Sequence, residues 1–170
     1  MIQAYTGDGK GKTTAAIGQA VRAYGRGWRV IVFQFLKPEG GSGELLTLAG
    51  LRPPLPVRPL GTGEFIINRP PTPEEIRRAE EGWDQVVRAM NSREYDLVVV
   101  DELSHAVNTG LLKVDRIAVD LDRRPKELSV VLTGRNMPGP LLAGADLVTE
   151  MRLVKHPFRK GIAAREGIEY

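Results

Sequence analysis

Short runs of apolar and β-branched residues recur along the chain, separated by segments with helical periodicity. Four such runs lie at residues 1–6, 28–35, 95–102, where the run ends in two carboxylates, and 128–133. Continuous apolar runs of this length predict strands that are buried on both faces of a parallel sheet. Weaker runs predict two further strands, at 57–60 and 146–154.

The intervening segments predict helices, because apolar side chains repeat there at three- and four-residue spacing. These segments are 12–25, 114–124 and 138–143. In the first of them the predicted buried stripe consists of Ala16, Ile17, Ala20, Val21 and Tyr24.

The segment after residue 71 carries the clearest helix start. Thr72 is a suitable N-cap, Pro73 suits the first helical position, and Glu75 can close a capping box. The apolar stripe that follows predicts one side of the helix facing the core. It includes Trp83, which is therefore interpreted as a core residue and not as a platform for a ligand.

Strands that alternate with helices predict an α/β protein with a mainly parallel sheet covered by helices on both faces. This is the three-layer sandwich typical of P-loop NTPases, and we expect one domain over residues 1–170. Residues 36–71 are rich in Gly and Pro. A long irregular segment inside a compact domain is usually functional, so a substrate loop is favoured there over a plain linker.

Composition narrows the class of protein. The chain has 170 residues, no Cys and two His, which excludes a disulfide framework and a thiolate metal site. No apolar run reaches the length of a membrane span, and the start does not resemble a signal peptide, so a cytoplasmic enzyme is expected. The net charge of +3 arises in 151–170, because the remaining residues contain 19 basic and 19 acidic side chains. A small-molecule anion is favoured over nucleic acid as the partner of this tail.

Residues 7–14 read as a phosphate-binding loop that leads into a helix. Glycines at alternate positions let backbone N–H groups approach an anion, and the helix N-terminus adds partial positive charge. Lys12 supplies a full charge, and Thr13 a hydroxyl that suits Mg²⁺. The usual first glycine is replaced by Thr6, and a glycine stands one position later. A plain Gly-rich turn is the less favoured alternative, and a dinucleotide fingerprint fits worse still.

Three side chains follow predicted strands and are expected at the same edge of the sheet. Asp101 and Glu102 end one strand, and their carboxylates suit Mg²⁺, directly or through water. Arg135 follows the next strand, and its guanidinium suits a polyphosphate. Two ordinary solvated acids and a surface ion pair are the alternatives.

Four stretches combine in a specific way. They are Gly7-Asp8-Gly9-Lys10-Gly11-Lys12-Thr13-Thr14, Val100-Asp101-Glu102-Leu103, Leu132-Thr133-Gly134-Arg135 with Ala145-Asp146-Leu147-Val148-Thr149-Glu150-Met151, and Lys155-His156-Pro157-Phe158 with Gly167-Ile168-Glu169. Together they resemble the P-loop class of ATP:corrinoid adenosyltransferases, also called cob(I)alamin adenosyltransferases. The similarity runs almost end to end.

The resemblance implies that reduced corrinoid cobalt attacks the 5′ carbon of ATP and releases triphosphate. Because cobalt(I) is itself the nucleophile, the protein has to position two substrates and stabilise a leaving polyanion. The resemblance assigns the nucleotide to Gly7, Asp8, Gly9, Lys10, Gly11, Lys12, Thr13 and Thr14. It assigns magnesium to Thr13 and Glu102, with Asp101 as an alternate or indirect ligand, and catalysis to Lys12, Arg135 and Phe65. It also implies a nucleotide that lies reversed in the loop.

Two departures from the family pattern concern the corrinoid. The middle loop reads Gly63-Glu64-Phe65-Ile66-Ile67 where relatives carry Gly-Phe-Thr-Trp, so Phe65 keeps one aromatic wall and the Trp is absent. The family's extension ahead of the first strand is also absent, and a lid from the partner subunit of a homodimer is expected to replace it. A reductase that supplies cobalt(I) is a further expected partner. His156 is interpreted as structural, in preference to a cobalt ligand.

Two other functions stay open at this point. A P-loop ATPase or small-molecule kinase would use Glu102 as the base that activates water or an acceptor hydroxyl. A carrier of corrinoid or nucleotide would bind without turnover. The preferred corrinoid, and a role in biosynthesis or in salvage, also stay open.

Overall fold

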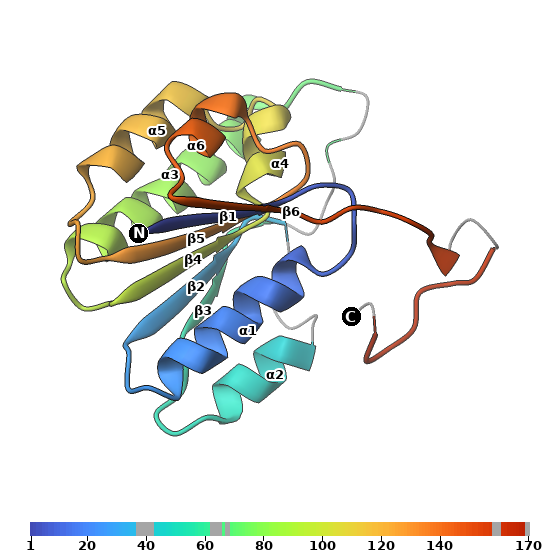
Figure 1. Cartoon of the computed structure of the whole chain (residues 1–170). Helices are drawn as coiled ribbons and strands as arrows, with labels where there is room; N and C mark the ends of the chain where they lie inside the picture. Colours follow the sequence, from blue (N-terminus) through green and yellow to red (C-terminus); the bar gives the residue numbers. More distant parts are fainter. Residues whose placement is uncertain (37–42, 62–65, 67–68, 158–160, 169–170) are drawn as a thin grey trace.

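A computed structural model describes residues 1–36, 43–61, 66, 69–157 and 161–168. Its centre is a six-stranded sheet in which all neighbouring strands run parallel, in the order β3-β2-β4-β5-β1-β6 (Figure 1). The strands are β1 (Ile2–Thr6), β2 (Val30–Gln34), β3 (Val57–Pro59), β4 (Leu97–Asp101), β5 (Ser129–Thr133) and β6 (Leu147–Glu150). Each lies within a run that the hydrophobic pattern predicts.

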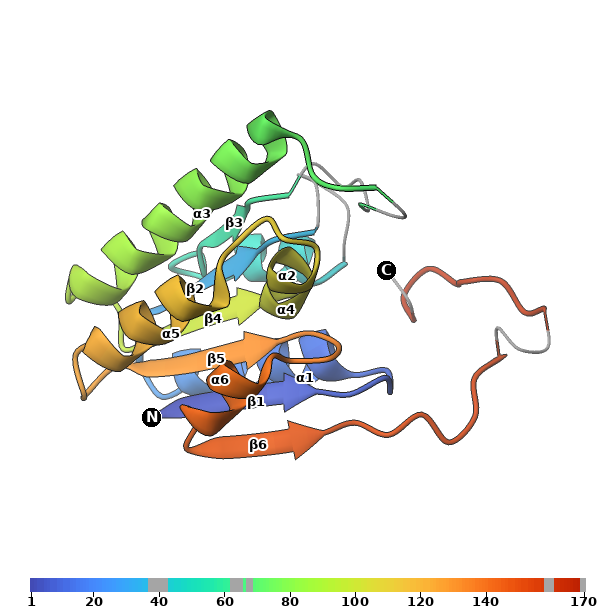
Figure 2. The ribbon, with the colours of Figure 1, turned by 90° about the horizontal axis from the view of Figure 1, so that it is seen from above.

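Helices cover both faces of this sheet. They are α1 (Lys12–Tyr24), α2 (Gly43–Gly50), α3 (Pro73–Asn91), α4 (Leu103–Asn108), α5 (Val114–Arg123) and α6 (Gly139–Ala143). Helices α1 and α2 form one layer, and α3, α4, α5 and α6 form the other (Figures 1 and 2). The predicted three-layer α/β sandwich is confirmed. None of the described helices has the length and apolar character that crossing a membrane requires.

Both helical layers are held by apolar packing. Trp83 of α3 is fully buried against the sheet and the helices of its own layer, as predicted, and its Nε1 donates to Asp120 Oδ2 at 2.8 Å.

The predicted capping box at the start of α3 is present. Thr72 Oγ1 accepts from the Glu75 backbone N–H at 3.2 Å, and Glu75 Oε2 accepts from the Thr72 N–H at 2.7 Å.

Three details of the sequence interpretation are wrong. Helix α2 lies within the segment expected to be irregular, where Leu48 anchors it against the α1 layer. Val21 is 45% exposed, because α1 buries the narrower stripe of Ala16, Ala20 and Ala23. Strand β6 ends at Glu150 and not at residue 154. It has β1 as its only paired neighbour in the described sheet, and β1 ends at Thr6, the register partner of Glu150.

The chain after β6 leaves the body of the protein. The described residues up to 157 run outward beyond the carboxyl ends of the strands, and residues 161–168 lie back toward the phosphate-binding loop (Figures 1 and 2). Lys10 Nζ donates to the backbone oxygen of Ile168 at 2.5 Å. The loop near the start of the chain and the last described residues therefore lie together.

Candidate active site

A cleft of about 600 Å³ lies at the carboxyl ends of the strands, where parallel α/β sheets bind their ligands. Most of the residues that the sequence predicts for the active site meet in this cleft. Its lining consists of Asp8, Gly9, Lys10, Gly11, Lys12, Thr13, Thr14, Ile17, Gly43, Glu44, Glu102, Arg135, His156, Gly167 and Ile168. Asp101 lies behind this wall, and Phe65 falls outside the described residues.

The phosphate-binding loop takes its shape from two left-handed glycines and a buried cation. Gly7 has φ +92° and Gly11, the N-cap of α1, has φ +115°, conformations that L side chains rarely adopt. Lys12 is buried, and its Nζ donates to the backbone oxygens of Gly7 at 2.7 Å and Gly9 at 2.8 Å. Its ammonium group is thus held inside the loop that it is predicted to serve.

Backbone hydrogen bonds join the loop to Met151, in the segment that follows β6. The sequence analysis did not predict a role for this residue. Gly9 N–H donates to the backbone oxygen of Met151 at 2.6 Å, and Met151 N–H donates to the Thr6 oxygen at 2.8 Å. A Cβ on Gly7 or Gly9 would come within 2.6 Å of that Met151 oxygen. These two glycines are therefore required by close backbone approach.

Thr6 explains the shifted glycine. It ends β1 in a buried position, and its Oγ1 accepts from the Met137 backbone N–H at 3.1 Å. A glycine here would leave that N–H without its partner, and an unpartnered buried N–H is costly. The tight turn accordingly begins one residue later, at Gly7.

Asp101 is the centre of a buried hydrogen-bond network. Its Oδ1 accepts from Thr13 Oγ1 at 2.8 Å and from Thr133 Oγ1 at 2.6 Å. Its Oδ2 accepts from Gln34 Nε2 at 3.2 Å. The carboxylate thereby joins the start of α1 to the ends of β2, β4 and β5. The predicted pair Thr13 and Asp101 is in direct contact, whereas Gln34 and Thr133 had no predicted role of their own.

Glu102 faces the cleft from an unusual backbone conformation. It is the N-cap of α4 with φ 57° and ψ 29°, in the left-handed region that few non-glycine residues occupy. Its N–H donates to Thr133 Oγ1 at 2.9 Å, which holds the turn. Burial lowers the pKa of Lys12, and the negative charge of Glu102 partly opposes that effect. Strain of this kind tends to occur at functional sites.

Arg135 reaches the cleft from a turn that α4 supports. Gly134 has φ +144°, and a Cβ there would overlap Ser104 Oγ. Ser104 Oγ donates to the Arg135 backbone oxygen at 2.6 Å, and Asn108 Nδ2 donates to the same oxygen at 3.3 Å. The sequence did not predict α4, yet this short helix fixes the backbone that carries the guanidinium.

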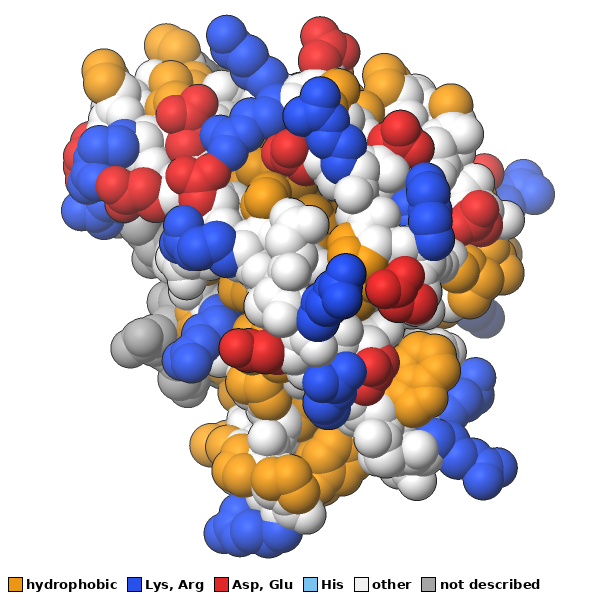
Figure 3. Space-filling model, turned by 90° about the vertical axis from the view of Figure 1, so that its left-hand side faces the viewer, with side chains coloured by type: hydrophobic (Ala, Val, Ile, Leu, Met, Phe, Trp, Pro, Cys, Tyr) orange, Lys and Arg blue, Asp and Glu red, His pale blue; other side chains and the backbone are white. Residues whose placement is uncertain are grey.

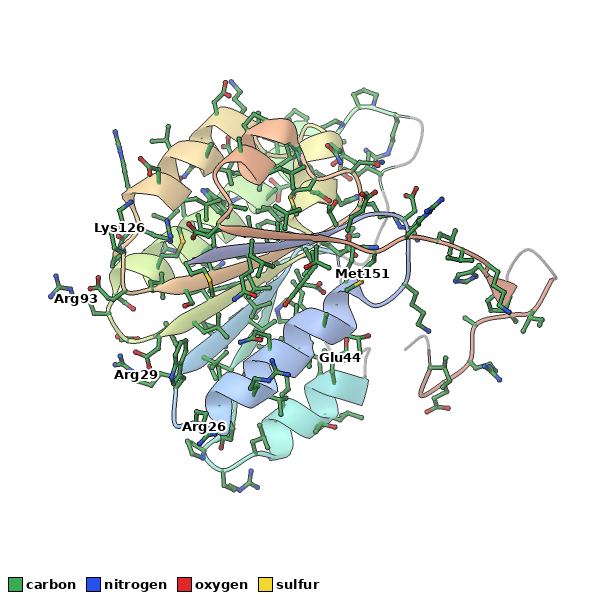
Figure 4. All side chains as sticks on the ribbon, viewed as in Figure 1. Arg26, Arg29, Glu44, Arg93, Lys126 and Met151 are labelled. Atoms are coloured by element: carbon green, nitrogen blue, oxygen red, sulfur yellow. The ribbon has the colours of Figure 1, made fainter. Side chains whose placement is uncertain are left out.

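Two further walls of the cleft were not predicted. Glu44, in the first turn of α2, contributes a carboxylate opposite the loop, and Ile17 of α1 contributes an apolar surface. Figure 4 shows Glu44 and Met151 at the end of α1 that begins beside the loop. The tail supplies His156 and Ile168. No local motif marks Glu44, because only the placement of α2 brings it to the site.

The fold and the loop define a P-loop α/β protein. A solved structure of flagellar accessory protein FlaH from Methanocaldococcus jannaschii is similar in fold, with a TM-score of 0.59 over 88% of this chain and 69% of that one. Its sequence is 13% identical, so this likeness concerns the fold alone.

Sequence comparison is more specific. Residues 1–170 match the family described as ATP:corrinoid adenosyltransferase BtuR/CobO/CobP. A corrinoid adenosyltransferase of Pseudomonas aeruginosa is 35% identical over the whole of this chain and 83% of its own length. One of Escherichia coli K12 is 36% identical, over the whole of this chain and 85% of its own. The chain belongs to the ATP:corrinoid adenosyltransferase family, which confirms the resemblance.

Proposed function

We propose that this protein transfers the 5′-deoxyadenosyl group of ATP to the reduced cobalt of a corrinoid and releases triphosphate. Family membership supports the reaction. The observation that carries it in the structure is the arrangement of three cations, Lys10, Lys12 and Arg135, around one glycine loop in one cleft. Such an arrangement suits a leaving group with several negative charges.

The residues of the cleft act by binding and orientation. In the reaction the bond between C5′ and the α-phosphate oxygen breaks, the electron pair leaves with triphosphate, and cobalt(I) supplies the pair for the new cobalt–carbon bond. Lys12 and Arg135 offset the charge that develops on triphosphate. The helix N-terminus at Gly11 adds fixed N–H dipoles. Because no proton has to be removed from the nucleophile, the reaction requires no general base.

A magnesium ion fits the oxygen-rich wall of the cleft. Within the described residues no three His, Cys, Asp or Glu side chains gather as a metal site, so a bound ion would also need oxygens from the nucleotide or water. The single hydroxyl proton of Thr13 points to Asp101, which leaves the lone pairs of Oγ1 for a cation. We assign the ion to Thr13 and Glu102, with Asp101 behind them. Magnesium would neutralise part of the triphosphate charge.

We also propose a homodimer, supported by the outer edge of the sheet. Strand β6 is an edge strand, and all four of its residues are exposed, including Leu147 and Val148. Exposed apolar strand edges invite pairing with another chain. A cytoplasmic location and a reductase that supplies cobalt(I) are part of the same proposal, because the reaction consumes ATP and a reduced corrinoid. Light scattering after size exclusion tests the dimer.

The direct test is incubation of the protein with ATP, magnesium and a chemically reduced corrinoid. Triphosphate and a light-sensitive cobalt–carbon product should form in equal amounts, and omission of the reductant should abolish both. ADP formed without corrinoid would instead indicate an ATPase or kinase. Tight binding of ATP and corrinoid without any product would indicate a carrier.

A further inference from the structure

Gln34 occupies an unusual position for an amide side chain. It is the last residue of β2, is 1% exposed, and pairs in register with Asp101 of β4. Its backbone oxygen accepts from Leu60 N–H at 2.8 Å, and the next residue, Phe35, donates its N–H to the Asp101 oxygen at 3.1 Å. The backbone on both sides therefore fixes where this side chain begins.

The charge of Asp101 fixes the orientation of the amide. Nε2 faces the Asp101 carboxylate at 3.2 Å, and the reversed amide would place two acceptor oxygens against each other. The other amide atom, Oε1, is buried and has no hydrogen-bond partner among the residues that the structure describes. Burial of an unpartnered acceptor opposes folding. An apolar side chain of similar size would avoid that cost but would leave the buried Asp101 Oδ2 without its donor, so the amide serves the carboxylate.

The Asp101 carboxylate has to be held in one rotation to do its work. Its Oδ1 receives the hydroxyl protons of both Thr13 and Thr133, and its Oδ2 receives the amide of Gln34. Loss of the amide would free Oδ2 and let the carboxylate turn. Thr13 would then lose the partner that directs its proton away from the cleft.

We propose that Gln34 is a positioning residue for the magnesium–nucleotide site, acting through Asp101 on the Thr13 hydroxyl. It does not line the cleft. Its amide keeps the carboxylate oriented so that Thr13 presents lone pairs, and not a proton, to the cation. The inference rests on the magnesium assignment of the proposed function.

The test compares Gln34→Leu with Gln34→Glu and with Gln3→Leu, a change at another buried glutamine. Gln3 lies on β1 and has its own hydrogen bond, from Tyr5 Oη. ATP affinity is measured by calorimetry with and without magnesium, and thermal unfolding is followed for each variant. A hydrogen bond to a charged group corresponds to roughly tenfold in affinity.

Gln34→Leu should lose about tenfold of the gain in ATP affinity that magnesium provides, with unchanged metal-free affinity, and its melting temperature should fall because the buried Asp101 Oδ2 loses its donor. Gln34→Glu should lose at least as much at a pH where both carboxyls are ionised, because two carboxylates then face each other with no donor between them. Gln3→Leu should keep the full magnesium effect. Unchanged magnesium dependence in Gln34→Leu, or no magnesium effect in the unaltered protein, would overturn the inference.

The two proposals can fail separately. If the unaltered protein forms the cobalt–carbon product and Gln34→Leu binds Mg·ATP normally, the positioning role fails and the reaction stands. If Gln34 controls magnesium-dependent ATP binding but no adenosyl transfer occurs, the reaction fails and the positioning role stands.

Discussion

The two edges of the parallel sheet use polar residues in opposite ways. At the carboxyl edge, polar side chains such as Thr6, Gln34, Asp101 and Thr133 are buried, and each makes a hydrogen bond. At the amino edge, charged side chains such as Arg29, Arg93 and Lys126 are exposed, and Figure 3, which faces that end, shows Lys and Arg interspersed with Asp and Glu. Arg26, Arg29, Arg93 and Lys126 are labelled there in Figure 4.

The difference separates residues that serve chemistry from residues that serve solubility and local stability. Buried polar groups are costly unless they are satisfied, and the carboxyl edge concentrates them around one cleft. Exposed pairs contribute little to stability. Arg29 Nη2 and Asp96 Oδ1 lie 2.7 Å apart, with side-chain exposures of 58% and 39%. Substitutions at the two edges should therefore change different measurements.

Lys12→Ala should have the largest effect and test the contrast most directly. Removal of one charged donor from a developing anion costs roughly a hundred- to a thousandfold in kcat. Triphosphate release measures this loss, and circular dichroism should show an intact fold. Lys126→Ala, at the amino edge, is the control and should keep full activity. Turnover by Lys12→Ala within tenfold of the unaltered protein would remove the loop from the mechanism.

Gly9→Ala should be nearly as damaging through shape alone. A Cβ at Gly9 would stand 2.6 Å from the Met151 oxygen, so the loop has to move. Overpacking of this kind costs about 1–3 kcal/mol, or roughly tenfold to a hundredfold in ATP affinity if the distortion falls on the loop. Gly18→Ala is the matched control, since nothing lies within 4 Å of its Cβ. Titration with a fluorescent nucleotide compares the two variants. Equal affinities would show that the close contact between Gly9 and Met151 is not needed for nucleotide binding.

The pH dependence of ATP binding should report on Lys12. Burial lowers the pKa of its ammonium group below the ordinary 10.5, and a bound triphosphate would raise that pKa again. The affinity for ATP should therefore be highest at pH values below the lowered pKa of Lys12 in the free protein. It should decrease as the pH rises from that pKa toward the higher pKa of Lys12 in the complex. Calorimetry from neutral pH upward measures the decrease. Lys12→Arg should remove this component, because guanidinium stays charged. An identical decrease in Lys12→Arg would exclude Lys12 as its source.

Arg29→Ala should have the smallest effect. The pair with Asp96 is exposed, so the free energy of unfolding should fall only slightly, and less at high salt. Hydrogen bonds from Arg29 hold the pKa of Asp96 at about 2. The contribution of the pair to stability is therefore fully present above pH 3.8, the ordinary pKa of an Asp side chain, and is lost as the pH falls toward 2. Urea unfolding at several pH values measures it. Reduced adenosyl transfer in Arg29→Ala would break the comparison between the edges.

Local patterns predicted the sheet, the capped start of α3 and the glycine-rich loop before α1, because each depends on neighbours in sequence. Helices α2 and α4 were missed for different reasons. The apolar contacts of α2 depend on the α1 layer that anchors Leu48, and α4 has six residues and starts from a left-handed Glu102. Neither gives a clear periodic signal.

The sequence predicted most residues of the candidate site but few of the contacts between them. Thr13, Asp101, Glu102 and Arg135 could be placed because parallel strands share a carboxyl edge. Gln34 could not, since its role depends on the register of β2 against β4, which no local motif records. The same holds for Met151. Phe65 lies outside the described residues, so its assignment to the corrinoid stays a prediction.

The contact between Met151 and the loop has a consequence for how the protein is made. The ribosome synthesises residues 6–11 long before it synthesises β6 and Met151. Until then Gly9 N–H and the Thr6 oxygen lack Met151, which is their hydrogen-bond partner in the folded structure. The nascent protein therefore contains every residue of the glycine-rich loop long before it contains Met151, whose backbone contacts hold the loop in its folded conformation. A chain cut before β6 should carry the motif and fail to bind ATP.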